Sequence, residues 1–142
     1  MHSRMQYLRM FYTCLQEVND VGGTCLQPLS FLYDIPGAQK DNDLLDKTFM
    51  VSRALKISPI LKPLNGQNVY QSYFPAGKWV NMADWAEIIS GADNVVSLSV
   101  RTTANIHLAP GALIPFQSNT NLKMMSTADV LAAPIMLVVN RD

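Results

Sequence analysis

The distribution of glycine and proline divides this chain into two parts of different character. Residues 3–19 contain neither residue, whereas from Thr24 onward short apolar or alternating runs are separated by proline, glycine and asparagine. Long uninterrupted segments favour helices, and short runs bounded by turn-forming residues favour strands. The sequence therefore predicts one N-terminal helix followed by a region of short strands.

The predicted helix runs from Ser3, its expected N-cap, to about residue 19, where Gly22 and Gly23 follow and favour termination. One face shows helical spacing of apolar residues: Met5, Leu8, Tyr12 and Leu15. Further apolar residues cover the other face: Tyr7, Met10, Phe11, Cys14 and Val18. A helix that is apolar on both sides needs neighbours on both sides. We expect it to fold back on the sheet, pair with a second copy, or contact a missing part of a larger protein.

The remaining sequence predicts strands connected by short turns, which is typical of an antiparallel β-sandwich or barrel. Pro28 predicts the edge or end of the first strand because proline has no N–H to donate. Residues 41–46 predict a polar loop or one helical turn, and residues 82–89 predict another. The predicted strands cover residues 25–29, 49–51, 55–58, 69–73, 78–81, 95–99, 106–108, 113–116 and 135–139.

The charge pattern argues against nucleic-acid binding and a membrane span. Eleven Lys and Arg residues balance eleven Asp and Glu residues, and no basic cluster occurs that could contact phosphates. No apolar run approaches the roughly 20 residues of a spanning helix, and residues 1–5 do not resemble a signal peptide. Charged residues make up only 15% of the chain, below the roughly 25% of soluble domains. This low share indicates that a partner covers part of the surface.

The two cysteines, Cys14 and Cys25, lie eleven positions apart and outside any C-x-x-C pattern. The sequence favours two buried thiols and leaves a disulfide as the alternative. Because neither cysteine has a histidine at ligand spacing, we expect no structural zinc.

No metal site is expected elsewhere. The acidic run Asp41, Asp43 and Asp46 lacks the glycine and glutamate that complete an EF-hand loop, so a solvated loop is expected. His2 and His107 are the only histidines, and neither lies in a pattern with carboxylates that would orient an imidazole as a ligand or base. No cofactor is implied.

The sequence predicts no catalytic or substrate-binding residue. Ser58 lacks the G-x-S-x-G elbow of a serine nucleophile. Several carboxylates lie beside turn residues, where solvent keeps their acidity ordinary: Asp34, Asp84, Glu87 and Asp93.

Longer stretches are more specific than any of these sites. Residues 73–81, Tyr-Phe-Pro-Ala-Gly-Lys-Trp-Val-Asn, and residues 105–117, Asn-Ile-His-Leu-Ala-Pro-Gly-Ala-Leu-Ile-Pro-Phe-Gln, resemble segments of glycoside hydrolase family 31, the α-glucosidases. Residues 49–61 are similar to that family's entry into its proximal C-terminal β-sandwich. Further upstream, Arg4, Leu8, Tyr12, Thr13 and Gly22 resemble its last barrel helix, and residues 28–31 its last barrel strand.

The resemblance implies residues 1–31 to be the terminal helix and strand of a truncated (β/α)8 barrel, and residues 32–142 a β-sandwich domain. It implies a structural role within an enzyme that hydrolyses terminal α-linked glucose with retention. The family's two catalytic aspartates precede the matched region, so this chain alone is expected to be inactive. Partners would be the rest of the barrel or a second copy, both reached through the N-terminal helix, while the whole enzyme takes the carbohydrate. The location would be lysosomal, secreted or in the endoplasmic reticulum lumen.

The chain departs from the family at two places. Gln27 stands where an arginine is usual, and Val51, Ser52 and Arg53 replace a tryptophan–glycine step. A neutral amide cannot make the bidentate carboxylate pair of an arginine, so an ion pair is expected to be missing. The alternative function is a free-standing, non-catalytic β-sandwich that binds carbohydrate or a protein partner. Its stacking platforms would be aromatic: Tyr70, Tyr73, Trp79 or Trp85.

Overall fold

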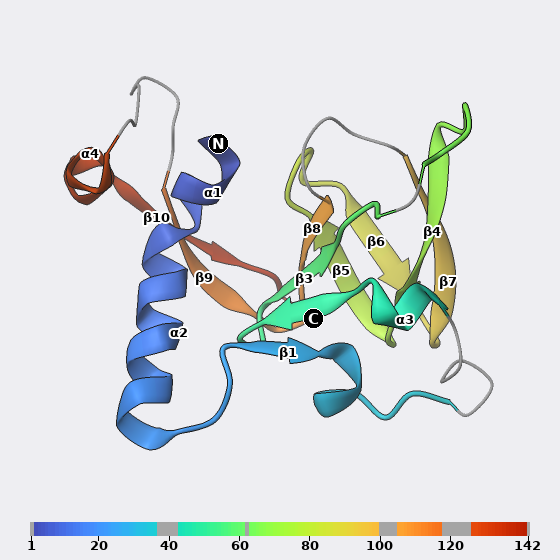
Figure 1. The fold of residues 1–142 in the computed structure, drawn as a ribbon, viewed down its shortest axis with the longest axis horizontal. Helices are drawn as coiled ribbons and strands as arrows, with labels where there is room; N and C mark the ends of the chain where they lie inside the picture. The colour runs from blue at the N-terminus through green and yellow to red at the C-terminus, as the bar shows by residue number, and fades with distance from the viewer. Residues whose placement is uncertain (1, 37–42, 62, 100–104, 118–125, 142) are drawn as a thin grey trace. The chain divides into compact units, whose positions relative to one another are not determined.

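The computed structural model describes residues 2–36, 43–61, 63–99, 105–117 and 126–141. They form mainly antiparallel β-structure with a few short helices, as the sequence predicts for a β-sandwich. The chain divides into two compact units, shown in Figure 1. Unit 1 comprises Met1–Cys25 and Leu113–Val139, and unit 2 comprises Leu26–Ala112 and Asn140–Asp142.

The predicted N-terminal helix is present but interrupted at Tyr7. Helix α1 spans His2–Gln6 and α2 spans Leu8–Val21. Tyr7 leaves helical geometry, with a φ of −103° and a ψ of 4°, and its ring packs edge-on against Phe116 at 5.3 Å between centroids. Burial of this ring raises the pKa of Tyr7 to about 12. Ser3 lies inside α1, so the prediction that it caps the helix is wrong.

The end of α2 follows the prediction closely. Gly22 has a φ of 81°, in the region that glycine enters without a steric penalty, and its N–H donates to the Val18 carbonyl at 2.9 Å. The helix extends to Val21, slightly beyond the predicted end.

The rest of unit 1 is a two-stranded sheet and a short helix. Strands β9 (Leu113–Gln117) and β10 (Ile135–Val139) pair antiparallel. The sequence predicts both strands but not α4 (Thr127–Ala132). A capping box starts α4, in which Ser126 and Asp129 bond each other's backbone N–H groups. The buried Gln117 amide donates to the Val130 and Ala133 carbonyls, which ties β9 to the end of α4.

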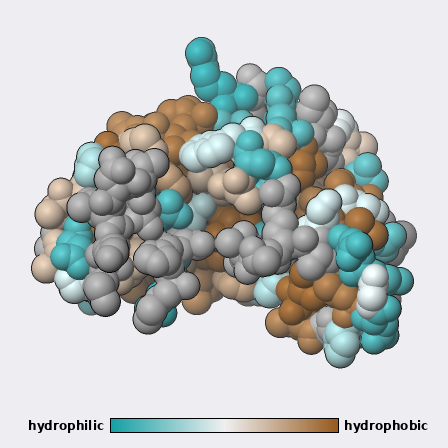
Figure 2. Space-filling model, turned by 90° about the horizontal axis from the view of Figure 1, so that it is seen from above, coloured by the Kyte–Doolittle hydropathy of each residue, from teal (hydrophilic) through white to brown (hydrophobic). Residues whose placement is uncertain are grey.

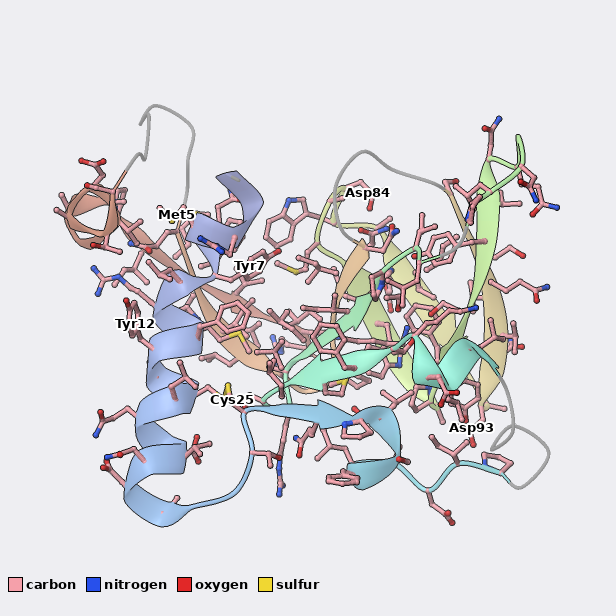
Figure 3. The ribbon with its side chains drawn as sticks, in the orientation of Figure 1. Met5, Tyr7, Tyr12, Cys25, Asp84 and Asp93 are labelled. Atoms are coloured by element: carbon pink, nitrogen blue, oxygen red, sulfur yellow. A yellow bond between two sulfur atoms is a disulfide. The ribbon has the colours of Figure 1, made fainter. Side chains whose placement is uncertain are left out.

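Within the described structure one apolar face of α2 is covered along its length, and the other is covered only near its start. Met10 and Cys14 are buried, whereas Tyr12 and Leu15 are 60% and 55% exposed. In Figure 3, Tyr7 points toward the strands of unit 1 and Tyr12 points away from them. On the apolar face with Met5, Leu8, Tyr12 and Leu15, Met5 and Leu8 pack against Val130 and Ala133, whereas Tyr12 and Leu15 meet solvent.

Cys14 and Cys25 form a disulfide, so the favoured prediction of two free thiols is wrong and the alternative holds. The bond connects the middle of α2 to the residue that precedes the first strand, and both cysteines are buried. Spacing in the sequence could not decide this, because pairing depends on how the chain turns back after Gly23.

Unit 2 is built from two sheets. The larger sheet has the order β1–β2–β3–β8–β5–β6, and the smaller one pairs β4 with β7, all antiparallel. The larger sheet contains β1 (Leu26–Pro28), β2 (Phe49–Val51), β3 (Leu55–Ser58), β8 (Asn105–Leu108), β5 (Gly77–Asn81) and β6 (Glu87–Ser90). The smaller sheet contains β4 (Val69–Phe74) and β7 (Asn94–Ser99), and two short helices complete the unit: η1 (Leu29–Phe31) and α3 (Asp43–Asp46).

The prediction of a helical turn or loop at residues 82–89 is wrong for its second half. Residues Glu87–Ser90 form β6, which pairs antiparallel with β5. The intervening turn is closed by the Asn81 side chain, which accepts from the Ala83 N–H, and by the Asn81 carbonyl, which accepts from the Trp85 N–H. Trp85 has a φ of 59°, so the chain reverses tightly and brings β6 alongside β5.

The core of unit 2 is aromatic and draws on both sheets. Trp79 on β5 is fully buried, and its ring centroid lies 5.7 Å from that of Phe74 on β4. The indole N–H donates to the Pro75 carbonyl at 2.9 Å, so burial of the ring leaves no polar atom unsatisfied. The core cluster contains Leu29, Ile35, Met50, Tyr73, Phe74, Trp79, Leu98 and Ala109.

Reduction of the disulfide should destabilise unit 1. A closed loop of this length restricts the unfolded chain, so its loss costs about 2–4 kcal/mol. We expect the thermal midpoint of the chain to fall in dithiothreitol, while a Cys14→Ala/Cys25→Ala variant gives the same lower midpoint with and without reductant. An unchanged midpoint on reduction would show that the bond contributes nothing to stability.

Candidate functional site

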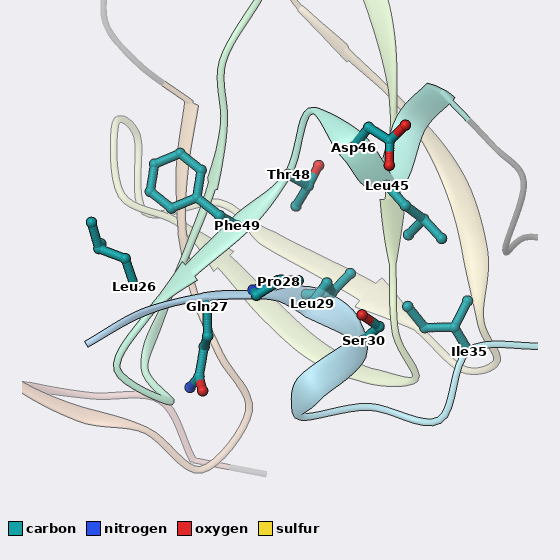
Figure 4. Close-up of a pocket in the computed structure, with 10 residues that line it drawn as sticks. All are labelled: Leu26, Gln27, Pro28, Leu29, Ser30, Ile35, Leu45, Asp46, Thr48 and Phe49. Atoms are coloured by element: carbon teal, nitrogen blue, oxygen red, sulfur yellow. The ribbon is translucent and has the colours of Figure 1, made fainter. Parts of the chain in front are cut away.

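A cavity of about 720 Å³ lies beside the first strand of unit 2 (Figure 4). It lies between β1 with η1 on one side and α3 with the start of β2 on the other. The lining residues are Leu26, Gln27, Pro28, Leu29, Ser30, Ile35, Leu45, Asp46, Thr48 and Phe49.

The chemistry of this cavity suits an apolar group rather than a reaction. Among its described lining residues Asp46 is the one ionisable side chain, so these residues offer no pair of acid and base. The Thr48 hydroxyl donates to the Leu44 carbonyl at 3.1 Å. Most of the remaining lining is aliphatic or aromatic, which favours burial against another hydrophobic surface.

The two departures from the family pattern contact each other, and one of them, Gln27, lines this cavity. Gln27 lies opposite Met50 in the β1–β2 ladder, and its amide donates to the Ser52 carbonyl at 3.0 Å. In Figure 4 the Gln27 side chain points away from Thr48 and Leu45. Ser52 has a φ of 54°, which is unusual for a residue with a side chain and suits the glycine expected from the resemblance.

A second constellation lies inside the sandwich. The Lys56 Nζ atom is 2.7 Å from Ser58 Oγ and 2.7 Å from Ser72 Oγ, and the two hydroxyl oxygens are 3.0 Å apart. Lys56 Nζ also lies 3.8 Å from the centroid of the Phe74 ring. A lysine beside two serines is an arrangement that can activate a nucleophile.

Burial argues against catalysis by this cluster. Lys56 is 0% exposed, and Ser58 and Ser72 are each 2% exposed, so no substrate atom can approach the hydroxyls. Burial also lowers the pKa of Lys56 well below its usual value. The Phe74 ring favours the charged form by about 0.5–2 kcal/mol, whereas removing an ammonium from water costs several kcal/mol. Desolvation therefore dominates.

Three other residues considered in the sequence analysis, His107, Asp84 and Asp93, make structural contacts. His107 is fully buried, and its ring packs edge-on against Phe74 at 4.9 Å. The Asp84 and Asp93 carboxylates accept hydrogen bonds from the Ala86 and Ala76 N–H groups, each at 3.0 Å, and both side chains are exposed. Figure 3 shows them at separate places in unit 2.

The sequence predicts a polar loop or one helical turn for the acidic run, and Asp43–Asp46 form the short helix α3. Asp46 ends α3 and Asp41 lies outside the described residues, as does the side chain of His2. Within the described part of the chain, no group of His, Cys, Asp and Glu is arranged to hold a metal ion.

The aromatic platforms considered for sugar stacking differ in exposure. Trp79 and Tyr73 are buried in the core, and burial, with the Asp93 carboxylate adding to it, raises the pKa of Tyr73. Tyr70 is partly buried, and its hydroxyl lies 3.4 Å from the Ser58 carbonyl that it donates to. Trp85 is 49% exposed. Sequence reasoning correctly places Trp79 in the core and Trp85 at the surface.

The two stretches that carry the family resemblance meet in space. Gly77, at the start of β5, has a φ of 124°, and a Cβ added there would lie 2.5 Å from Cγ of Pro110. The Asn140 amide donates to the Lys78 carbonyl at 2.7 Å and to the Ala109 carbonyl at 2.9 Å, which joins both stretches. The sequence of each stretch therefore reflects a close approach to the other.

The family described as Glycosyl hydrolase family 31 C-terminal domain matches residues 22–114. The chain belongs to glycoside hydrolase family 31. The α-glucosidase of Mucor javanicus is 28% identical, over 99% of this chain and 16% of its own length. Probable maltase-glucoamylase 2 of Homo sapiens is 24% identical, over 82% of this chain and 4% of its own length.

Solved structures show the same fold within much longer proteins. A cycloalternan-forming enzyme from Listeria monocytogenes matches with a TM-score of 0.73 and 21% identity, over 98% of this chain and 13% of that protein. A glucosidase II alpha subunit matches with a TM-score of 0.80 and 14% identity, over 97% of this chain and 14% of that protein. This family 31 chain thus spans less than a fifth of each of these relatives. No helix among its described residues is long and apolar enough to cross a membrane.

A side chain at Gly77 should disrupt this family 31 domain. Gly77→Ala places a methyl group against Pro110 and imposes a φ that L-residues rarely adopt, so we expect a loss of about 2–4 kcal/mol in the free energy of unfolding. Gly91→Ala is the matched control, because its φ is ordinary and nothing lies within 4 Å of its added Cβ. Urea unfolding of both variants measures the difference, and equal midpoints would contradict the close approach.

Proposed function

We propose that this chain acts as the C-terminal structural region of an α-glucosidase-like enzyme, where it supports the catalytic barrel and helps to shape the rim of the sugar pocket. One observation carries the proposal. The chain aligns over 97–99% of its own length with family 31 relatives but covers only 13–16% of theirs. A domain of this family would then work as part of a longer catalytic assembly.

Exposed apolar surface supports a role within a larger protein. Tyr12 and Leu15 on α2 and Val21 at its end are exposed to solvent, and the cavity beside β1 is lined mainly by apolar residues. Figure 2 shows hydrophobic residues reaching the surface on the face in view. Exposed apolar surface in each unit fits contact with another part of a protein. The assignment of residues 1–31 to a truncated barrel and residues 32–142 to a sandwich belongs to this proposal.

The parent reaction under this proposal is retaining hydrolysis of terminal α-linked glucose. That chemistry needs two carboxyl groups about 5 Å apart, one as nucleophile and one as acid and base. The Asp84 and Asp93 carboxylates accept hydrogen bonds from backbone N–H groups instead. Among the described residues that line the cavity, Asp46 is the one carboxylate. Both catalytic carboxylates would come from the barrel, and this chain would supply no catalytic, substrate-binding or metal-binding residue.

The disulfide bears on where the protein is located. Disulfides persist in oxidising compartments and are rare in the cytosol. The Cys14–Cys25 bond therefore supports a lysosomal, secreted or endoplasmic-reticulum location over a cytosolic one.

The alternative, a free-standing module that binds carbohydrate or a protein partner, has less support. Among the proposed stacking residues only Trp85 is largely exposed, and sugar-binding surfaces normally combine several convergent groups.

The isolated chain tests the proposal. We expect it to hydrolyse no aryl α-glucoside, and to bind a hydrophobic dye or self-associate through the exposed face of α2. A Tyr12→Lys/Leu15→Lys variant should lose much of the dye fluorescence, whereas Thr13→Lys, an exposed polar neighbour on the same helix, should not. A monodisperse monomer that binds no dye, or any hydrolysis by the purified chain, would contradict the proposed role.

A further inference from the structure

The buried cluster of Lys56, Ser58 and Ser72 connects the two sheets of unit 2. Lys56 and Ser58 lie on β3 of the larger sheet, and Ser72 lies on β4 of the smaller one. The 2.7 Å contact from Lys56 Nζ to Ser72 Oγ and the 3.0 Å contact between the serine oxygens both cross between the sheets. The cluster is therefore a polar tie between the two sheets.

The hydrogen bonds of the cluster fit either protonation state of the Lys56 amine, so burial and the absence of a carboxylate on the adjoining strands favour the neutral form. A neutral lysine has two N–H donors, and the structure offers two serine oxygens at 2.7 Å to accept them. A charged ammonium has a third donor, and the Phe74 ring 3.8 Å away is a weak partner for it.

The strands around Lys56 carry one histidine and two tyrosines but no acid, and the short helix α3, which packs against β4, carries Asp43 and Asp46. His107 on β8 is its cross-strand partner, and Met50 lies opposite it on β2. On β4 the titratable residues are Tyr70, whose hydroxyl bonds the Ser58 carbonyl, and Tyr73. None of β2, β3, β4 and β8 contains an Asp or Glu. A proton taken up by Lys56 would therefore place a positive charge between the sheets without a carboxylate on the adjoining strands.

We propose that the Lys56–Ser58–Ser72 cluster is a pH-sensitive lock between the two sheets of unit 2, closed when Lys56 is neutral and loosened when Lys56 takes up a proton. The inference goes beyond the proposed function, since it concerns this chain's own stability and holds whether or not the chain belongs to a larger enzyme.

The sign of the effect follows from proton linkage. Burial lowers the pKa of Lys56 in the folded chain, while the unfolded chain keeps the usual value near 10.5. Between these two values the unfolded state binds more protons, so stability rises with pH and falls as pH decreases toward the folded pKa. One such group changes the ratio of unfolded to folded molecules by up to tenfold for each pH unit.

Urea unfolding of the full 142-residue chain between pH 7.5 and 9.5 tests the lock. The unfolding constant of the wild type should fall steeply as pH rises, whereas that of Lys56→Met should change little. Lys56→Met should also be more stable than the wild type at pH 7.5, because Ser58 and Ser72 keep each other as partners. Lys78→Met, which removes an exposed lysine from β5, should retain the wild-type slope. Equal slopes for the wild type and Lys56→Met would overturn the proposal.

Competitive labelling of lysines measures the opening of the same cluster without a complete unfolding transition. A trace of acetic anhydride labels neutral amines, and mass spectrometry gives the rate at Lys56 relative to exposed Lys78. Because Lys56 reacts only from an opened state, this ratio should lie far below one and fall further, by up to tenfold per pH unit, as pH rises. A ratio near one, or one independent of pH, would overturn the proposal.

Discussion

The aromatic core around Trp79 is the constraint on which unit 2 depends. The indole is fully buried, contacts Phe74 and Tyr33, and has its N–H satisfied by the Pro75 carbonyl. This placement requires the strand to begin at Gly77, whose backbone passes against Pro110. The two stretches of sequence that identify the family are thus the two sides of one packing arrangement.

Some apolar residues lie outside this core and are exposed, which fits the proposed role within a larger protein. Tyr12 and Leu15 on α2 remain exposed, and the cavity beside β1 is lined mainly by apolar groups. Neither feature offers the paired carboxylates of a glycosidase. The same chain therefore combines a sandwich with a buried aromatic core and exposed apolar surfaces suited to contact.

Local patterns in the sequence predict most of the strands, and β2, β3 and β10 have the predicted bounds. Strand β6 is missed because the turn that creates it requires Trp85 in a conformation that favours glycine. Helix α4 is too short to show a period, although Ser126 and Asp129 give a capping signal. The disulfide and the Lys56 cluster could not be predicted, because both join residues whose proximity depends on tertiary packing.

The size of the native polypeptide tests the central claim most directly. Mass spectrometry of the protein from its source, with peptides that span and flank Met1 and Asp142, would show what polypeptide contains this sequence. A species several-fold larger than 15.8 kDa, with acidic barrel-strand peptides upstream, is the expected result. A native species of 15.8 kDa with these termini would contradict the role as a region of a larger α-glucosidase-like enzyme.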